Sequence, residues 1–198
     1  MGGIFALKVC VYAICKNESQ FVDRFMDSMS EADYVCVLDT GSSDDTVKKL
    51  RARGVIVGET VVSPWRFDTA RNESLGLIPA DADICCAIDL DEQFHPGWRA
   101  ALERAWQPDT TRARYRYTWS FRPDGSEGMV FWADKIHKNG CYRWASPVHE
   151  TLAYTGEGAE RFVDAAGVQL DHHPDETKSR GQYLPLLELA VRELSLIH

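Results

Sequence analysis

The sequence predicts an α/β fold: a doubly wound, mostly parallel sheet with helices on both faces, then a smaller antiparallel section and a C-terminal helix. Two observations predict the sheet. Apolar runs alternate with segments of helical spacing as far as residue 106, an order typical of parallel strands joined by helices. Residues 112–122 instead alternate between apolar and polar side chains, which is typical of an antiparallel strand with one solvated face.

The expected elements follow in order along the chain. Strands are expected at residues 7–14, 34–38, 55–57 and 84–90, and helices at 18–29, 46–53, 67–78 and 96–106. Pro96 opens the last of these helices, at a position where proline is tolerated. A turn at 123–126 joins strands 112–122 and 128–136, and a further helix begins at Glu176. We therefore expect one domain over residues 1–174, with halves 1–95 and 96–174, and a C-terminal helix over 175–198.

The composition narrows the functional class. The 198 residues include 22 basic and 30 acidic side chains, for a net charge of −8. This argues against a nucleic-acid-binding protein, because such binding needs Lys and Arg to neutralise phosphates. No apolar stretch approaches the ~18 residues of a membrane span, and the N-terminus is not a convincing signal peptide. The six cysteines form no CxxC pair, which favours a reducing compartment. We expect a cytoplasmic protein without a transmembrane segment.

Polar and acidic residues gather where the expected parallel strands end, which is where α/β sheets bind ligands. They are Asn17 and Glu18, the segment 39–45, and the group Asp89, Asp91 and Glu92. In an extended strand, residues two apart point to the same side, so Asp89 and Asp91 would face one volume. Paired carboxylates there suit Mg²⁺ or Mn²⁺. The alternative is that they only solvate and terminate the strand.

The segment 39–46 has two interpretations. Ser42 and Asp45 match a capping box, and Gly41 gives the turn conformational freedom. Capping does not account for Asp39, whose carboxylate could accept hydrogen bonds from ribose hydroxyls or a base edge. The free backbone amides of the helix start could also receive anionic groups.

Four motifs occur together over residues 9–95: CKNE at 15–18, DTGSSDDT at 39–46, FDTARN at 67–72 and DLDE at 89–92. In order and spacing they strongly resemble the family-two glycosyltransferases with a GT-A fold, within them the branch of lipopolysaccharide-core and helical-repeat glycosyltransferases. After residue 110 the resemblance rests on VHE at 148–150 and DHHP at 171–174. It implies a GT-A catalytic domain over 1–174, with a nucleotide-binding half (1–95) and an acceptor half (96–174).

The resemblance implies an inverting, metal-dependent enzyme that moves a sugar from a nucleotide-diphosphate donor, with a UDP-sugar preferred, to a hydroxyl or other nucleophile. The acceptor would be a glycan, a lipid-linked sugar or a protein. Binding of this substrate would bring the enzyme to the inner face of a membrane. Mn²⁺ or Mg²⁺ would be the cofactor. The implied donor-binding residues are Asn17, Glu18, Asp39, Ser42, Arg71 and Asp89. The implied metal ligands are Asp89, Asp91 and one of the adjacent His172 and His173.

The catalytic base is a separate question. An inverting transfer needs a carboxylate that takes a proton from the acceptor hydroxyl. Glu150 is our choice, with Asp91 and Glu92 as rivals, and the alternative is that Glu150 is merely an exposed loop residue.

Two other functions stay open. A degenerate nucleotide-sugar or carbohydrate-binding module would bind the donor with metal and not transfer the sugar. A nucleotidyltransferase is less favoured, because residues 11–19 contain no glycine for a loop that grips a triphosphate. No GxGxxG follows the first strand, which disfavours a Rossmann dehydrogenase or methyltransferase.

Three patterns in the second half allow more than one interpretation. Arg112, Arg114 and Arg116 form a row that could meet an acidic acceptor or simply face solvent. Five aromatic residues could form a sugar-stacking wall or pack in the core: Trp119, Phe121, Trp132, Tyr142 and Trp144. The last helix has an apolar stripe at Tyr183, Leu186, Leu187, Ala190, Val191 and Leu194. This stripe predicts a covering surface: the chain's own sheet, further helices after a truncated C-terminus, or a homodimer partner.

Overall fold

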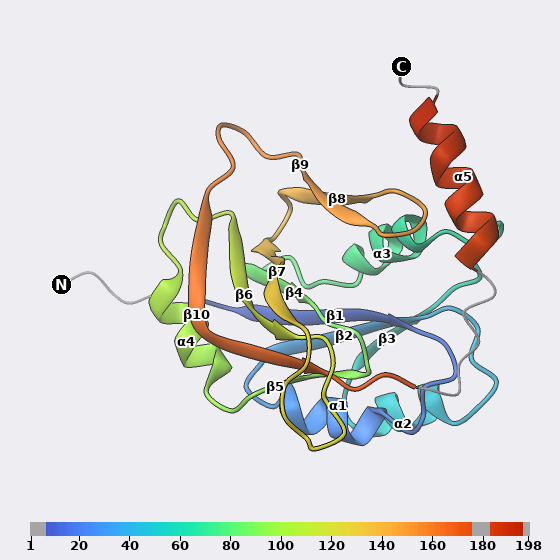
Figure 1. The fold of residues 1–198 in the computed structure, drawn as a ribbon, viewed down its shortest axis with the longest axis horizontal. Helices are drawn as coiled ribbons and strands as arrows, with labels where there is room; N and C mark the ends of the chain where they lie inside the picture. The colour runs from blue at the N-terminus through green and yellow to red at the C-terminus, as the bar shows by residue number, and fades with distance from the viewer. Residues whose placement is uncertain (1–6, 176–182, 196–198) are drawn as a thin grey trace.

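The computed structural model of the chain describes residues 7–175 and 183–195 (Figure 1). In chain order the elements are β1 (Val9–Cys15), α1 (Val22–Ser28), β2 (Tyr34–Asp39), α2 (Thr46–Ala52), β3 (Ile56–Glu59), α3 (Phe67–Leu75), β4 (Ile84–Ala87), β5 (Glu92–Phe94), α4 (Trp98–Ala105), β6 (Arg112–Thr118), β7 (Val130–Lys138), β8 (Tyr142–Ala145), β9 (Thr151–Tyr154), β10 (Phe162–His172) and α5 (Tyr183–Ser195).

The strands form one large and one small sheet. The large sheet has the order β3-β2-β1-β4-β7-β6-β10-β5, and β8 pairs with β9 alone. The first four strands of that order are parallel, β7 is antiparallel to both neighbours, and β10 is parallel to β6. The order β3-β2-β1-β4 is that of a doubly wound sheet. The expected fold class is therefore confirmed, with a smaller antiparallel sheet and a C-terminal helix added to a mostly parallel sheet.

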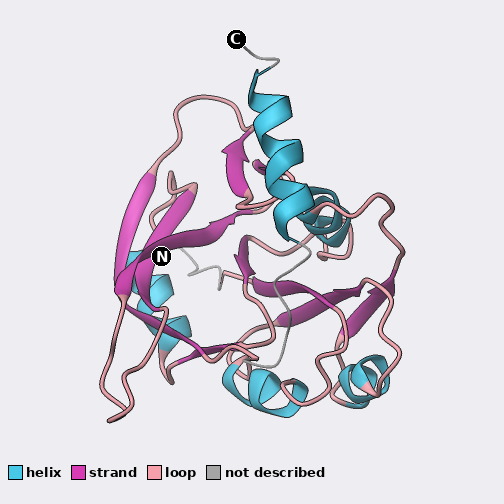
Figure 2. Ribbon diagram, turned by 45° about the vertical axis from the view of Figure 1, so that its right-hand side comes forward, coloured by secondary structure: helices cyan, strands magenta, loops and turns pink. Residues whose placement is uncertain are grey.

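Apolar side chains cover both faces of the large sheet. Every residue of β1 and β4 is buried, as expected for strands between two layers. One core packs α1, α2 and α4 below the sheet in Figure 1 and includes Phe25, Leu50 and Trp98. The other packs α3 and the β8–β9 ribbon above it and includes Tyr12 and Trp144. Figure 2 shows helices on both sides of the strands from a second direction.

The structure corrects several expected boundaries. β4 ends at Ala87, and residues 89–92 form a turn in which the N–H of Glu92 donates to the carbonyl of Asp89 at 3.0 Å. β5 follows at once and pairs antiparallel with β10. Pro96 does not open α4, whose N-cap is Gly97 with a φ of 85°. A three-residue strand such as β5 is too short for its alternation to be recognised in a sequence.

The C-terminal helix α5 stands at the edge of the molecule (Figure 1). Leu186 is buried, whereas Leu184, Leu187 and Val191 are exposed. Among the described residues, Leu187 and Val191 of the stripe are therefore not covered, and a homodimer or further helices stay predictions. Residues 176–182 and the side chains of two stripe positions, 183 and 194, lie outside the described residues.

Two expectations from composition can be compared with the structure. The six cysteines are all free, and five of them are buried. Within the described residues, no helix combines the length and the apolar character needed to span a membrane.

Candidate active site

The loop after β2 folds around the carboxylate of Asp39. Its Oδ1 accepts hydrogen bonds from the N–H groups of Gly41 (2.9 Å) and Ser42 (2.8 Å), and its Oδ2 accepts one from the Ser42 hydroxyl. Gly41 has a φ of 104°, a backbone conformation that favours glycine. Asp39 is buried, so its carboxylate shapes this loop. The expected contact with a nucleoside stays a prediction.

The loop after β1 joins the same network. The N–H of Asn17 donates to Ser42 Oγ at 2.8 Å, and Asn17 Oδ1 accepts the N–H of Ser43 at 2.7 Å. The N–H of Glu18 donates to Thr46 Oγ1 at 2.8 Å. The structure therefore brings the first two motifs together at the adjacent carboxyl ends of β1 and β2.

The capping box expected between Ser42 and Asp45 does not form. Asp45 is the N-cap of α2, but its side chain makes no capping hydrogen bond with the described residues. Asp44, not Asp45, accepts the hydrogen bonds at the start of α2. Its Oδ1 accepts the N–H of Thr46 at 3.0 Å, and its Oδ2 accepts the N–H of Ser19 at 3.2 Å. Burial alone would raise the pKa of Asp44, but hydrogen bonds from the hydroxyl and N–H of Thr46, together with those from Ser19, lower it to about 2.

Arg71, on α3, joins two acidic segments that are far apart in the sequence. Its Nη2 donates to Asp89 Oδ2 at 3.0 Å, and its Nε donates to Glu150 Oε1 at 2.6 Å. Only 4% of Arg71 is exposed, and its guanidinium lies 5.0 Å from the ring centroid of Trp144. Burial alone would lower the pKa of Arg71, but the charges of Asp89 and Glu150 raise it. The buried Nη1 has no hydrogen-bond partner among the described residues.

The turn 89–92 separates the two aspartates. The expectation that an extended strand aims Asp89 and Asp91 to one side is wrong, because the chain turns here. Asp89 contacts Arg71, whereas Asp91 Oδ2 lies 3.4 Å from Nε2 of His172. The two carboxylates thus have different nearest neighbours, and their shared metal role stays a prediction.

Glu92 points inward from the same turn. Its Oε2 accepts the N–H of Asp89 at 2.8 Å, and its Oε1 accepts the hydroxyl of Tyr117 at 2.6 Å. Burial raises the pKa of this carboxyl group. Only 2% of Glu92 is exposed, and both carboxylate oxygens already accept hydrogen bonds within the protein. Its role as a rival base stays a prediction.

Lys135, on β7, is a cation that no motif indicated. Its Nζ lies 3.9 Å from Asp89 Oδ2 and 3.8 Å from Glu92 Oε1. Burial alone would raise the pKa of Asp89, but Arg71 and Lys135 lower it to about 2. The pKa of Lys135 would be lowered by burial, and Glu92 and Asp89 raise it above its usual value. Asp89 therefore lies between two cations.

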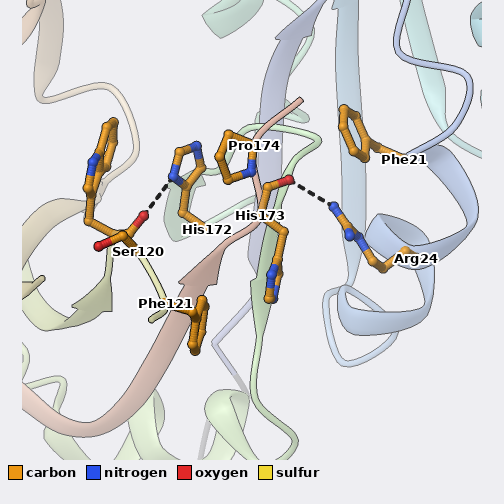
Figure 3. Close-up of a pocket in the computed structure, with 8 residues that line it drawn as sticks. Phe21, Arg24, Ser120, Phe121, His172, His173 and Pro174 are labelled. Carbon is orange, nitrogen blue, oxygen red and sulfur yellow. Dashed lines mark hydrogen bonds between the residues drawn. The ribbon is translucent and has the colours of Figure 1, made fainter. Parts of the chain in front are cut away.

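The adjacent histidines point to opposite sides of the chain (Figure 3). Nδ1 of His172 donates to the carbonyl of Trp119 at 3.0 Å, which leaves Nε2 beside Asp91. The ring of His173 instead stacks on Phe121, with ring centroids 5.1 Å apart and planes within 1°. Of the two histidines, the one whose ring lies next to a motif carboxylate is His172.

The pair Asp91 and His172 fits a divalent cation. Carboxylate and imidazole are both ligands of Mn²⁺, and a metal-bound histidine usually donates its other ring N–H, as His172 does to Trp119. Within residues 7–175 and 183–195, no three His, Cys, Asp or Glu side chains form a metal-holding group. Two protein ligands are typical of a cation that also binds substrate phosphates.

Glu150 reaches the site from the loop between β8 and β9. Asn72 holds that ribbon on α3, because its Nδ2 donates to the carbonyl of Trp144 at 2.8 Å and its Oδ1 accepts the N–H of Trp144 at 2.9 Å. His149, next to Glu150, has a φ of 53° and is exposed. The VHE segment therefore lies at the same site as the Asp89–Glu92 turn.

The other patterns of the second half are mostly structural. The arginine row is a set of ion pairs: Arg112 with Asp134 and Glu160, Arg114 with Asp164, and Arg116 with Glu127. Tyr142 and Trp144 are buried in the core, whereas Trp119, Phe121 and Trp132 are exposed. Arg114 is exposed and Arg116 is partly exposed, as a solvated face predicts, but Arg112 is buried, so the solvated-face interpretation is wrong for that residue. A stacking wall is limited to the exposed rings.

No known family profile matches the chain. Solved structures do, at low sequence identity. The crystal structure of a mycobacterial protein is 15% identical over 86% of this chain and 69% of its own, with a TM-score of 0.56. The chain shares that fold.

A glucosyl-3-phosphoglycerate synthase from Mycobacterium tuberculosis matches a smaller part. Its complex with Mn²⁺ and UDP-glucose is 25% identical over 56% of this chain and 44% of the synthase chain, with a TM-score of 0.47. Its complex with Mn²⁺, UDP and phosphoglyceric acid has the same identity and TM-score over 43% of the synthase chain. The match thus spans less than half the length of the synthase, and those ligands belong to that enzyme.

Proposed function

We propose that the chain is the catalytic part of an inverting, metal-dependent glycosyltransferase that uses a UDP-sugar, with residues 1–174 as the catalytic domain. The observation that carries the proposal is the position of Arg71. One buried guanidinium joins the Asp89–Glu92 turn to Glu150 at the carboxyl ends of the sheet strands, where α/β folds bind ligands. Arg71 also presents a buried N–H donor, Nη1, that has no partner among the described residues and that a diphosphate oxygen could accept.

Donor binding divides among three groups of residues. The cluster of Asn17, Glu18, Asp39 and Ser42 would take the nucleoside. Nη1 of Arg71, a buried donor without a partner among the described residues, would bind a diphosphate oxygen. Asp91 and His172 would hold Mn²⁺ or Mg²⁺, and Asp89 would hold Arg71 and Lys135 in place.

The transfer itself needs one proton acceptor. The acceptor hydroxyl oxygen forms a bond to the anomeric carbon, the bond from that carbon to the diphosphate oxygen breaks, and UDP leaves with the electron pair. The hydroxyl proton passes to Glu150, which Arg71 holds at the site. The bound cation supplies positive charge that stabilises the leaving diphosphate.

Metal-dependent binding of UDP tests the proposal. The variant Asp91→Asn should lose Mn²⁺-dependent binding of UDP and keep its fold, because Asp91 lies on a partly exposed turn. Wild-type protein should gain about 2.7 kcal/mol of stability when free UDP with Mn²⁺ is at 100 times its Kd. Thermal unfolding with UDP, with and without Mn²⁺, measures this.

The matched control is Asp109→Asn, which makes the same change at an exposed residue in the loop between α4 and β6. It should bind UDP as the wild type does. Unchanged Mn²⁺-dependent binding in Asp91→Asn would contradict the metal assignment. Binding of a UDP-sugar with metal, without hydrolysis or transfer to any acceptor, would favour the degenerate binding module.

A further inference from the structure

A cavity of about 480 Å³ opens beside the site, between α1, the end of the β6 segment and the residues that follow β10 (Figure 3). It is lined by Phe21, Arg24, Trp119, Ser120, Phe121, His172, His173 and Pro174. None of these residues is a donor-site residue proposed above except His172. The volume is within the range of small-molecule sites, roughly 300–1,000 Å³.

The walls of the cavity are aromatic and partly open. Trp119 stacks on His172, with centroids 4.4 Å apart, and Phe121 stacks on His173. Each of these two rings has an imidazole against it, yet Trp119 remains 42% and Phe121 36% exposed. The aromatic surface that is left can pack against the apolar C–H groups of a sugar ring or polyol.

The charge of the cavity is positive. Arg24 is the one Arg or Lys among the lining residues named above, which include no Asp or Glu, although the whole chain carries −8. Nη2 of Arg24 donates to the carbonyl of His173 at 3.3 Å, and its guanidinium lies 5.0 Å from the ring centroid of Phe21. Neither contact neutralises the charge, and both orient the guanidinium. Two carboxylates next to lining residues in the sequence have partners outside the cavity: Asp23 pairs with Arg53, and Asp171 pairs with His95. Asp91 reaches only the far ring nitrogen of His172.

His172 connects the cavity to the proposed metal site, because its ring lines the cavity and its Nε2 lies beside Asp91. We propose that this cavity binds the acceptor, and that the acceptor is a sugar or polyol with an anionic group. Its ring packs on Trp119 and Phe121, and its phosphate or carboxylate pairs with Arg24. This assignment rests on the proposed function for the identity of the neighbouring site.

Three sugars that share one ring test the assignment on the full chain. Glucose, glucuronate and glucose 6-phosphate differ at one carbon, which carries a neutral group, a carboxylate or a phosphate. We expect the two anions to bind at least about ten-fold more tightly than glucose, because a hydrogen bond between charged groups is roughly twice as strong as one between neutral groups. The anion that binds with the lower Kd identifies the charged group of the acceptor. Calorimetry gives the affinities. If the ligand lies in the cavity, it should quench tryptophan fluorescence in the wild type, and this quenching should be absent in Trp119→Phe.

Variants of Arg24 separate charge from packing. Arg24→Gln should lower the affinity for both anions about ten-fold and leave glucose unchanged, whereas Arg24→Lys should keep most of the preference. Arg114→Gln is the matched control, because Arg114 is exposed and pairs with Asp164 outside the cavity. Arg24→Gln should also bind UDP with Mn²⁺ as the wild type does. If the wild type binds the anionic sugars but does not bind UDP with Mn²⁺, the proposed function is rejected and the anion-binding cavity is not.

Three results would overturn the acceptor assignment. They are the absence of binding by all three sugars, equal binding by all three, or equal effects of Arg24→Gln and Arg114→Gln on the anions. If Arg24→Gln does not fold, Arg24→Lys and Phe121→Ala decide the question, since Phe121→Ala should weaken binding of both anions.

Discussion

Arg71 is a buried charge whose desolvation is offset by two carboxylates. Its hydrogen bonds to Asp89 and Glu150 tie α3 to the Asp89–Glu92 turn and to the β8–β9 loop. Removal of one partner from a buried ion pair costs about 3–5 kcal/mol, because the remaining charge is left without compensation. Both acids therefore stabilise the site, and their chemical roles must be measured in variants that keep Arg71 bound.

Glu150→Gln keeps an acceptor for Arg71 and cannot take a proton. We expect UDP binding with Mn²⁺ close to that of the wild type and a loss of sugar transfer by a factor of about 10²–10⁴. Calorimetry with UDP and the rate of UDP release from the UDP-sugar in the presence of acceptor measure the two effects.

Glu157→Gln is the control for Glu150, since it makes the same change at an exposed residue after β9. Near-normal turnover in Glu150→Gln would eliminate Glu150 as the base. Loss of UDP binding would place Glu150 in the donor site instead.

At the scale of elements, an irregularity in the pairing of β6 with β7 gives Lys135 its position. Ala113 pairs with Ile136, whereas Tyr115 pairs with Ala133, so β7 has one extra residue between these pairs. Such bulges re-aim side chains and are frequent beside active sites. Ala133 and Ile136 lie in the same core, and Lys135 between them reaches Asp89. The sequence could not reveal this, because a bulge is defined by the partner strand.

The β8–β9 ribbon depends on one side chain of α3. Asn72→Ala removes both hydrogen bonds to the backbone of Trp144, whose side chain is buried, and we expect a loss of about 2 kcal/mol of stability. Amide hydrogen exchange should show faster opening of β8 and β9 than of β1. Asn72→Asp retains the acceptor for the Trp144 N–H, so an effect as large as that of Asn72→Ala would contradict this account.

At the scale of the whole molecule, the sequence predicted the sheet, its parallel half and the strand ends at which polar residues gather. The resemblance puts Arg71 and Asp89 in one donor-binding set, and the structure brings these two side chains into contact. Lys135, the inward turn of Glu92 and the choice between His172 and His173 could not be predicted. Each depends on a residue that is distant in the sequence. Lys135 lies near Asp89, Glu92 accepts the hydroxyl of Tyr117 on β6, and His172 donates to the carbonyl of Trp119.

A buried histidine should make the stability of the molecule depend on pH. Nε1 of Trp144 donates to the Tyr12 hydroxyl at 3.0 Å, that hydroxyl donates to Nε2 of His137 at 2.8 Å, and Nδ1 of His137 donates to the carbonyl of Lys138 at 3.0 Å. Burial lowers the pKa of His137 from 6.5 to about 4. The unfolded chain therefore binds a proton between these values, and the folded chain does not.

The free energy of unfolding should consequently fall by about 1.4 kcal/mol for each pH unit as the pH drops from 6.5 to about 4. The full contribution of the neutral His137 is present above pH 6.5. Urea unfolding at a series of pH values measures this slope. The variant His137→Gln has no titrating group there, so its slope over this window should be smaller by the same amount. Equal slopes in the two proteins would contradict the assignment of a neutral His137.

The pairing of β5 with β10 has a consequence for the time at which the site is completed. Asp91 and His172 are about 80 residues apart along the chain, so the loop that their meeting closes is long and its closure is entropically unfavourable. During synthesis, the first four strands can pair in parallel well before β10 has left the ribosome. A nascent chain would thus form the loops that follow β1 and β2 early and would bring Asp91 and His172 together late, so the site is assembled from one part that is local in the sequence and one that waits for nearly the whole chain.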